Sequence, residues 1–400
     1  MTRRTSPAAP PTAVVWDPTL LGYKFTATHP MNPVRLELTE RLTRDLGVLD
    51  APNVSLIAPE VADDQTLSAV HGADYIAAVR AASDHGTASA AHGLGTEDNP
   101  LFANMHLAAA RIADGTLQLA HALGTGEAVR GVNFAGGMHH AARSTASGFC
   151  IYNDAALAIQ HLLDHGARRV LYIDVDAHHG DGTQSIFYSD PRVMTVSLHQ
   201  SGVTLFPGSG YPNETGQGDA EGTAVNLAVP PGTGDAGFLR AFHAVVPQLV
   251  RAFAPEVIVS QHGCDSHVND PLSDLRLSIE GQRQMALDVA FFADEHCEGR
   301  WIATGGGGYA VYDVVPRSWS HLTAVAAGTP IPLRTPTPGS WLEYVKNTYG
   351  VDAPALMHDE ADLWWRTWEL GFDPEDAIDR AVVQTRKEIF PLWGLDPLFD

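Results

Sequence analysis

The chain has 400 residues, of which 44% are hydrophobic and 18% are charged. These values are typical of globular proteins, and the lack of repeats and low-complexity stretches argues against a disordered or solenoid protein. Lys and Arg together number 25 against 47 for Asp and Glu, which gives a formal net charge of −22. This charge repels phosphate backbones, so direct binding to nucleic acid is not expected.

Residues 1–12 are rich in proline, which predicts a flexible tail before a first strand over residues 13–17. The tail turns to Pro and Ala where a signal peptide requires a continuous apolar stretch, and no later segment is long enough to span a bilayer. Three cysteines occur without a CxxC pair, as is usual in a reducing compartment. We therefore expect a cytoplasmic protein with no membrane contact, in which histidines and carboxylates hold any metal.

Apolar, β-branched runs alternate with helical patterns along the body of the chain. This order predicts an α/β fold with a mostly parallel central sheet and helices on both faces. The expected strands cover 170–176, 193–198, 256–260 and 300–304, and the expected helices cover 101–122, 153–165, 235–252 and 278–297. Ligand sites in such folds lie at the carboxyl ends of the strands.

One catalytic domain is expected over residues 13–330. Residues 331–400 begin with a Pro-rich stretch and continue with the aromatic segments WLEYV, LWWRTW and IFPLW. Because these aromatic side chains need burial, we expect an extension that packs on the same domain.

Two polar motifs follow predicted strands and together offer metal ligands. Asp176 and His178 are two residues apart at the end of one strand, so their side chains leave on the same face. Asp265, in HGCDSH after the strand at 256–260, is their natural partner. Two carboxylates and one imidazole leave room for a water, as a catalytic zinc site requires. Taken alone, the first motif is also consistent with a solvated polar strand end.

A second candidate group is the pair His139 and His140 in GGMHHA. Two imidazoles in one pocket can transfer protons, one taking a proton from a water and one giving a proton to a departing amine. Adjacent histidines are more often structural than catalytic. Asp174 and Asp181, which flank the metal motif, are available to orient the two rings and favour the catalytic interpretation.

The stretch GGGGYA at 305–310 follows the last predicted strand. It lacks the Lys-Ser/Thr of a phosphate-binding P-loop. Four glycines would instead let Tyr309 approach a carbonyl group, where its hydroxyl could donate a hydrogen bond to a developing oxyanion. A packing role for Tyr309 is equally consistent with this stretch alone.

Six segments in this order resemble the zinc-dependent histone deacetylase superfamily over roughly residues 14–325, most closely its class I branch and bacterial acetoin-utilisation members. They are GGMHHA (136–141), ASGFCIYND (146–154), YIDVDAHHGDGTQ (172–184), VMTVSLH (193–199), HGCDSHVNDP (262–271) and GGGGY (305–309). The resemblance implies an arginase/deacetylase-like fold. Near the third metal ligand, Cys264 and His267 depart from the commonest residues of the family.

The resemblance also implies site residues. Zinc, or iron in the cell, would be held by Asp176, His178 and Asp265; His139 paired with Asp174 and His140 paired with Asp181 would be the electrostatic and acid-base histidines; Tyr309 would polarise the scissile carbonyl. The substrate would meet Gly148, Phe149 and Phe206 along a narrow tunnel, Asp98 at its rim and Arg35 near the acetate exit.

The family further implies bound potassium. One site would use Asp174, Asp176, His178, Ser197 and Leu198, and a second would use Phe187, Asp190, Val193 and Thr223, the last where the family often has tyrosine.

The expected activity is hydrolysis of the acetyl amide of acetyllysine in proteins or peptides, with release of acetate. An acetylated polyamine or other small amide is the alternative substrate. A binuclear manganese ureohydrolase would need bridging carboxylates where this chain has Gly180 and His267. An inactive acyl-lysine reader should have lost a ligand, a histidine or Tyr309, and none is lost.

Overall fold

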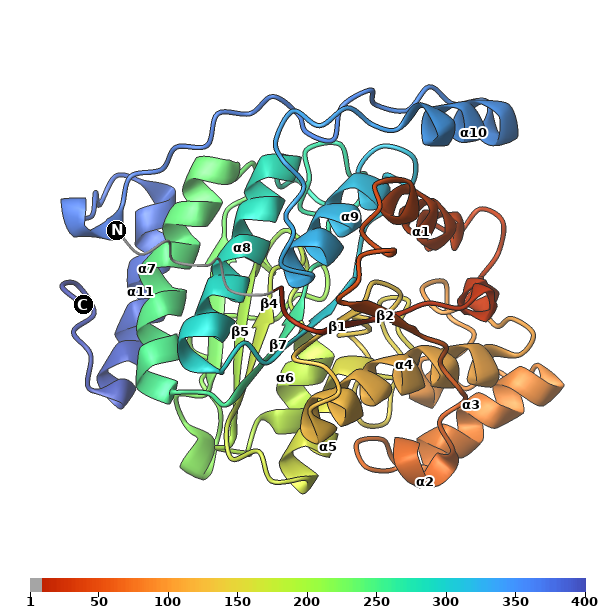
Figure 1. Cartoon of the computed structure of the whole chain (residues 1–400). Helices are drawn as coiled ribbons and strands as arrows, with labels where there is room; N and C mark the ends of the chain where they lie inside the picture. Colours follow the sequence, from red (N-terminus) through yellow and green to blue (C-terminus); the bar gives the residue numbers. More distant parts are fainter. Residues whose placement is uncertain (1–8) are drawn as a thin grey trace.

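Within residues 9–400, which this computed structural model describes, eight parallel strands form one central sheet (Figure 1). The strand order across the sheet is β2-β1-β3-β8-β7-β4-β5-β6, and every neighbouring pair is parallel. The strands are β1 (Thr12–Val15), β2 (Val54–Ile57), β3 (Arg130–Asn133), β4 (Val170–Asp174), β5 (Val193–Gln200), β6 (Ala224–Val229), β7 (Val257–Gln261) and β8 (Trp301–Thr304). The predicted α/β fold with a parallel sheet is confirmed.

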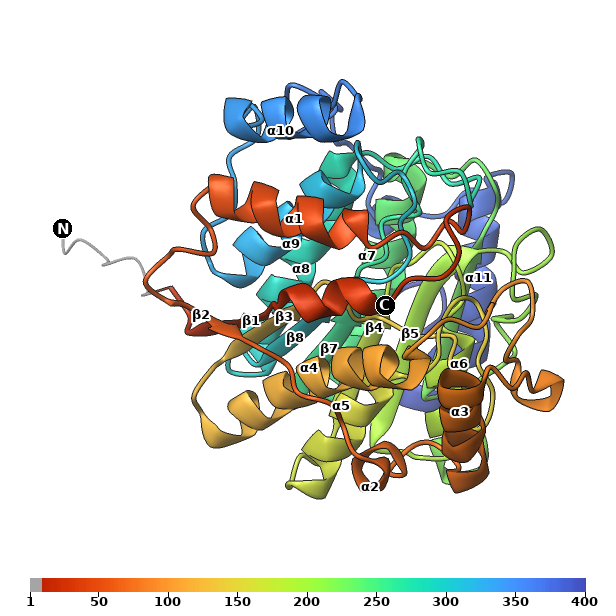
Figure 2. The same cartoon turned by 90° about the vertical axis from the view of Figure 1, so that its right-hand side faces the viewer.

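Helices cover both faces of the sheet (Figure 2). One face packs against α4 (Met105–Thr125) and α5 (Asp154–Asp164), and the other packs against α7 (Asp235–Phe253), α8 (Ile279–His296) and α9 (Val315–Ala326). The other helices are α1 (Val34–Asp45), α2 (Asp64–Leu67), α3 (Ala73–His85), α6 (Asp181–Phe187), α10 (Gly339–Tyr349) and α11 (Ala377–Ile389).

The central strands β4, β5 and β7 are buried at every residue. Because helices cover both faces, these strands are nearly continuous apolar runs, and the predicted ranges agree with the observed ends to within two residues. The helix predicted from residue 101 begins only at Met105, since Asn104 adopts a left-handed backbone conformation at φ 61°.

Residues 1–8 of the predicted tail lie outside the described residues. Thr12 already belongs to β1, is buried, and donates from its hydroxyl to the carbonyl oxygen of Ala326 at 3.2 Å. The first strand therefore starts one residue before the predicted range.

Residues 331–400, here called the C-terminal segment, contact both ends of the helical layer on one face. Trp341 of α10 is fully buried against α1, and its indole N–H donates to the carbonyl oxygen of Leu38 at 3.0 Å. In Figure 1 the blue chain then runs along the top of the molecule from α10 to α11, which packs on α7 and β6. Trp364 is 72% exposed, so not every aromatic side chain of the segment is buried.

Among residues 9–400, no helix combines the length and the apolar character that crossing a membrane requires.

Candidate active site

The polar motifs follow three strands that are neighbours in the sheet, in the order β8, β7, β4. Parallel strands end at the same edge, so the loops after them meet there. These loops contribute Tyr309 after β8, Asp265 after β7 and Asp176 after β4. One cavity at this edge is lined by Asp176 and His178 after β4, by Gly306, Gly307 and Tyr309 after β8, and by residues of the segments 137–140 and 148–150.

Asp176, His178 and Asp265 form the deepest cluster of this site. Nδ1 of His178 lies 3.1 Å from Oδ1 of Asp176 and 3.0 Å from Oδ2 of Asp265, and all three side chains are buried. One potential ligand atom from each residue lies within 4.8 Å of the other two. Burial and repulsion by the neighbouring Asp176 carboxylate raise the pKa of Asp265 to about 6. This donor set fits a single divalent cation, which would relieve that repulsion.

Two hydrogen bonds hold the Asp176 carboxylate in place. Its Oδ2 accepts the side-chain N–H of Gln261 at 2.7 Å and the backbone N–H of Gly307 at 2.8 Å. Glycines leave the space for this packing, since a Cβ on Gly263 would stand 1.8 Å from the same oxygen. Such hydrogen bonds to the far side of a metal ligand orient it.

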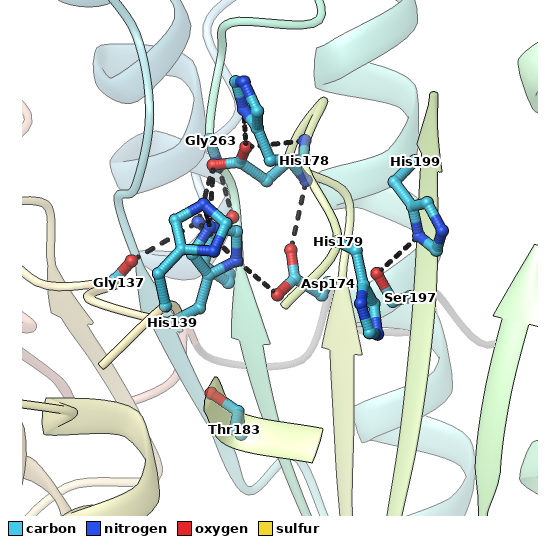
Figure 3. A network of polar contacts seen from close by, with 12 residues as sticks. Gly137, His139, Asp174, His178, His179, Thr183, Ser197, His199 and Gly263 are labelled. Carbon is cyan, nitrogen blue, oxygen red and sulfur yellow. Dashed lines mark hydrogen bonds and ion pairs between the residues drawn. The ribbon is translucent and has the colours of Figure 1, made fainter. Parts of the chain in front are cut away.

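His139 and His140 lie beside this cluster. Nδ1 of His139 lies 2.8 Å from Oδ2 of Asp174 (Figure 3), and Nδ1 of His140 lies 2.7 Å from Oδ1 of Asp181. The two Nε2 atoms are 3.1 Å apart. Each ring is therefore oriented by its own carboxylate, and the free nitrogens face each other.

The two histidines differ in charge. Burial opposes protonation of His139, but the carboxylates of Asp174 and Asp176 outweigh it and raise its pKa to about 9. Burial, followed by the charge of His139, lowers the pKa of His140 to about 4 in spite of Asp181. At neutral pH His139 is therefore protonated and positively charged, whereas His140 is neutral and can accept a proton.

Tyr309 lines the same cavity at the end of the glycine stretch. Its backbone N–H donates to Oδ2 of Asp270 at 2.7 Å. Arg35, which is 2% exposed, donates to the carbonyl oxygens of Gly306 and Gly308 at 2.9 and 3.0 Å. Burial raises the pKa of the Tyr309 phenol well above its usual value, so the hydroxyl keeps its proton and can donate.

Comparison with known proteins decides the family. The model of the histone deacetylase domain matches residues 29–326. The chain belongs to the histone deacetylase family. The family predicted from the six motifs is thereby confirmed, and it supports a deacetylase, that is, a hydrolase of a generally metal-dependent family.

Three relatives of this histone deacetylase family member are acetoin utilization proteins named AcuC. The one from Bacillus subtilis (strain 168) is 39% identical over 383 residues, which cover 94% of this chain and 97% of the relative. That of Staphylococcus aureus (strain MSSA476) is 41% identical over 324 residues, covering 80% and 82%. That of Staphylococcus xylosus is 41% identical over 335 residues, covering 83% and 86%.

Aromatic rings stand at the mouth of the deacetylase cavity. The Phe206 ring lies 5.0 Å from that of His140, and the Phe149 ring lies 5.8 Å from that of Tyr309. Gly148 is essential to this packing, because a Cβ there would stand 2.3 Å from the His140 ring. Asp98 is exposed, and its carbonyl oxygen lies 3.2 Å from Nε2 of His29, whose ring packs on Phe149. The structure thus connects Asp98 to Phe149 through His29 and places Arg35 against the glycine stretch before Tyr309.

The first set of residues expected to bind potassium shares Asp176 and His178 with the candidate metal cluster and takes its other members from β4 and β5. Ser197 pairs with Asp174 across β4 and β5, and its hydroxyl lies 2.8 Å from Nδ1 of His199 (Figure 3), while Leu198 is fully buried in β5. For the second set, the backbone N–H of Asp190 donates to Phe187 and that of Val193 to Asp190. Thr223 borders β5 through a bond from the N–H of Thr195.

Three polar residues of the site had no role in the sequence prediction. Gln261 is the last residue of β7 and holds Asp176. Asp154 accepts the backbone N–H groups of Gly137 and Met138 and so shapes the turn before the histidines. Asp270 holds Tyr309. Asp154 and Asp270 lie inside two of the motifs and Gln261 directly precedes one, which marks them as candidates, but their roles depend on partners 16, 39 and 85 residues away along the chain.

Proposed function

We propose that this protein is a zinc-dependent deacetylase that hydrolyses the acetyl amide of acetyllysine side chains in proteins and releases acetate. The observation that supports the proposal most strongly is the cluster of Asp176, His178 and Asp265, two of whose members, Asp176 and His178, line one cavity together with His139 and His140. When bound by these three residues, zinc would polarise the amide carbonyl and acidify a water molecule.

The chain's own groups account for the proton transfers. Neutral His140 accepts a proton from the attacking water, and Asp181 stabilises the charge that then forms on its ring. Positively charged His139, held by Asp174, stabilises negative charge that develops on the substrate. The proton taken from water passes to the nitrogen as the C–N bond breaks, and the amine also takes up the proton that the new carboxylic acid loses, so that water and amide give acetate and a protonated amine.

Tyr309 and the aromatic mouth position the acyl group. The Tyr309 hydroxyl donates to the carbonyl oxygen as it gains negative charge. Phe149 and Phe206 offer flat apolar faces to the methylene groups of a lysine side chain. Gly148 admits that chain without a competing Cβ, Asp98 accepts from the substrate's backbone, and Arg35 stabilises departing acetate.

Further ions and the cellular setting are part of the proposal. Potassium would bind at Asp174, Asp176, His178, Ser197 and Leu198, where it would offset carboxylate charge, and a second ion would bind at Phe187, Asp190, Val193 and Thr223. Iron could replace zinc in the cell. The cytoplasm is the proposed compartment, because Cys150, Cys264 and Cys297 are all free thiols.

Acetate release from two substrates tests the proposal. Protein stripped with a chelator would be assayed with an acetyllysine peptide and with an acetylated polyamine, each with and without added zinc. We expect zinc-restored release from the peptide. Preference for the polyamine would assign the small-amine alternative, to which the net charge of −22 is also suited. No release from either substrate would contradict a deacetylase.

A further inference from the structure

Residues 264–270, here called the ligand turn, carry a proposed metal ligand near one end and a support for Tyr309 at the other. Oδ1 of Asp265 accepts the backbone N–H of Ala177 at 2.9 Å. Oδ2 of Asp270 accepts the backbone N–H of Tyr309 at 2.7 Å. The position of this one turn therefore affects both the metal cluster and the tyrosine.

His267 lies in the middle of the ligand turn and is fully buried. Its Nδ1 accepts the backbone N–H of Asn269 at 3.1 Å, which leaves the ring proton on Nε2. Nε2 lies 2.8 Å from Oδ2 of Asp359 and donates to it. With both ring nitrogens engaged, the ring has one orientation, and through it the turn is tied to Asp359.

Asp359 belongs to the C-terminal segment, beyond the residues 29–326 that match the histone deacetylase domain. Its carboxylate also accepts the backbone N–H of Ile279 at 2.9 Å and Nη1 of Arg317 at 2.8 Å. Arg317 is 2% exposed and lies in α9. Because three donors from three separate segments hold this carboxylate, it restricts the position of His267 and of the turn.

The charge of Asp359 strengthens its hydrogen bond to His267. Burial raises the pKa of the Asp359 carboxyl, but the hydrogen bond from His267 and the charge of Arg317 outweigh it and hold the pKa well below its usual value. Asp359 is therefore charged at neutral pH. Bonds to a charged acceptor are roughly twice as strong as neutral ones.

We propose that Asp359 is a positioning residue of the active site, which holds the ligand turn through His267 so that Asp265 stays in the metal cluster and Tyr309 lines the cavity. The C-terminal segment then contributes to the geometry of the active site and does not only pack on the surface of the domain. This inference rests on the proposed zinc-dependent function. Groups that orient metal ligands typically change metal affinity by about 10–100-fold, and Asp359 acts through one intervening residue.

The test uses Asp359→Asn in the full chain, which keeps the size of the side chain and removes its charge. Asp379→Asn is the control, because Asp379 is a carboxylate of the same segment whose partners Arg240 and Arg366 lie outside the ligand turn; its side chain is 0% exposed against 25% for Asp359, so it is the more severe test of stability. The zinc dissociation constant would be measured by competition with a chelator, alongside Tm, kcat and KM. We expect Asp359→Asn to weaken zinc binding and to lower kcat by about tenfold each, with KM nearly unchanged.

His267→Gln supplies a second variant, because it removes the ring and leaves Asp359 bonded to Arg317 and Ile279. It should show the same losses of zinc affinity and kcat. The double variant should lose no more than either single variant, because the two residues act through the same series of contacts. The inference is overturned if Asp359→Asn keeps wild-type zinc affinity and kcat. It is also overturned if Asp379→Asn lowers Tm by the same amount as Asp359→Asn and loses as much zinc affinity and kcat. A wild-type protein that binds no zinc and releases no acetate would instead refute the proposed function.

Discussion

Gly263→Ala adds one methyl group at the most crowded point of the metal cluster. A Cβ on Gly263 would stand 1.8 Å from Oδ2 and 2.5 Å from Cγ of Asp176, whereas contacts under 3.0 Å are essentially never seen. The carboxylate must therefore move by about 1 Å. It is not free to do so, because Gln261 and the backbone N–H of Gly307 both hold the crowded oxygen.

The size of the effect follows from that displacement. Misplacing a reacting group by about 1 Å can cost about 100-fold in rate, and disturbing a metal ligand's supports costs about 10–100-fold in metal affinity. We expect Gly263→Ala to lose about 100-fold in kcat and at least tenfold in zinc affinity. Acetate release under saturating zinc and chelator competition measure the two quantities.

Gly124→Ala is the matched control for this experiment. It makes the same chemical change in α4, where nothing lies within 4 Å of the added Cβ. Alanine is the better helix former, so we expect unchanged kcat and a gain in stability of up to about 1 kcal/mol. Wild-type kcat and zinc affinity in Gly263→Ala would refute the packing of Asp176 described above.

Three further predictions concern single side chains. His140→Ala should lower kcat by at least about 100-fold while zinc stays bound, because a positioned acid-base group is typically worth that much; equal turnover would rule out His140 as the proton acceptor. Tyr309→Phe should lower kcat by about 100-fold or more and leave KM nearly unchanged, and a change confined to KM would contradict its role at the oxyanion. Buried His71 should lower the stability of the protein in acid, because burial lowers its pKa to about 4. Its Nε2 accepts the backbone N–H of Asn153 at 3.0 Å and is therefore unprotonated in the fold. The unfolded chain takes up this proton below about pH 6.5 and the folded chain only near pH 4, so this contribution is present above pH 6.5 and lost as pH falls. By urea unfolding, the stability lost between pH 7 and pH 5 should be about 2 kcal/mol larger in the wild type than in His71→Gln, and equal losses in both proteins would contradict the assignment.

The parts of the fold that the sequence predicted well are those encoded locally. Because β4, β5 and β7 are buried on both faces, their sequences are nearly continuous apolar runs, and this pattern predicts strands. β3 was missed because its four residues RGVN include two polar ones, Arg130 and Asn133, which find buried partners only in the folded chain. The edge strand β2 is half exposed and has no such pattern.

The candidate site shows the same division. Asp176 and His178 are close in sequence, and the parallel order of strands is enough to bring Asp265 to them. Gln261 and Asp359 could not be assigned, because their roles depend on contacts across 85 and 92 residues of chain. Nothing near Asp359 in the sequence indicates that it reaches the ligand turn.

The most direct test of zinc-dependent deacetylation is a titration of chelator-stripped protein with zinc while acetate release from an acetyllysine peptide is followed. The cluster of Asp176, His178 and Asp265 predicts that activity is absent without metal and rises to its maximum at one zinc per chain. Full activity in the stripped protein, or a maximum that requires two metals per chain, would contradict a single zinc at this cluster.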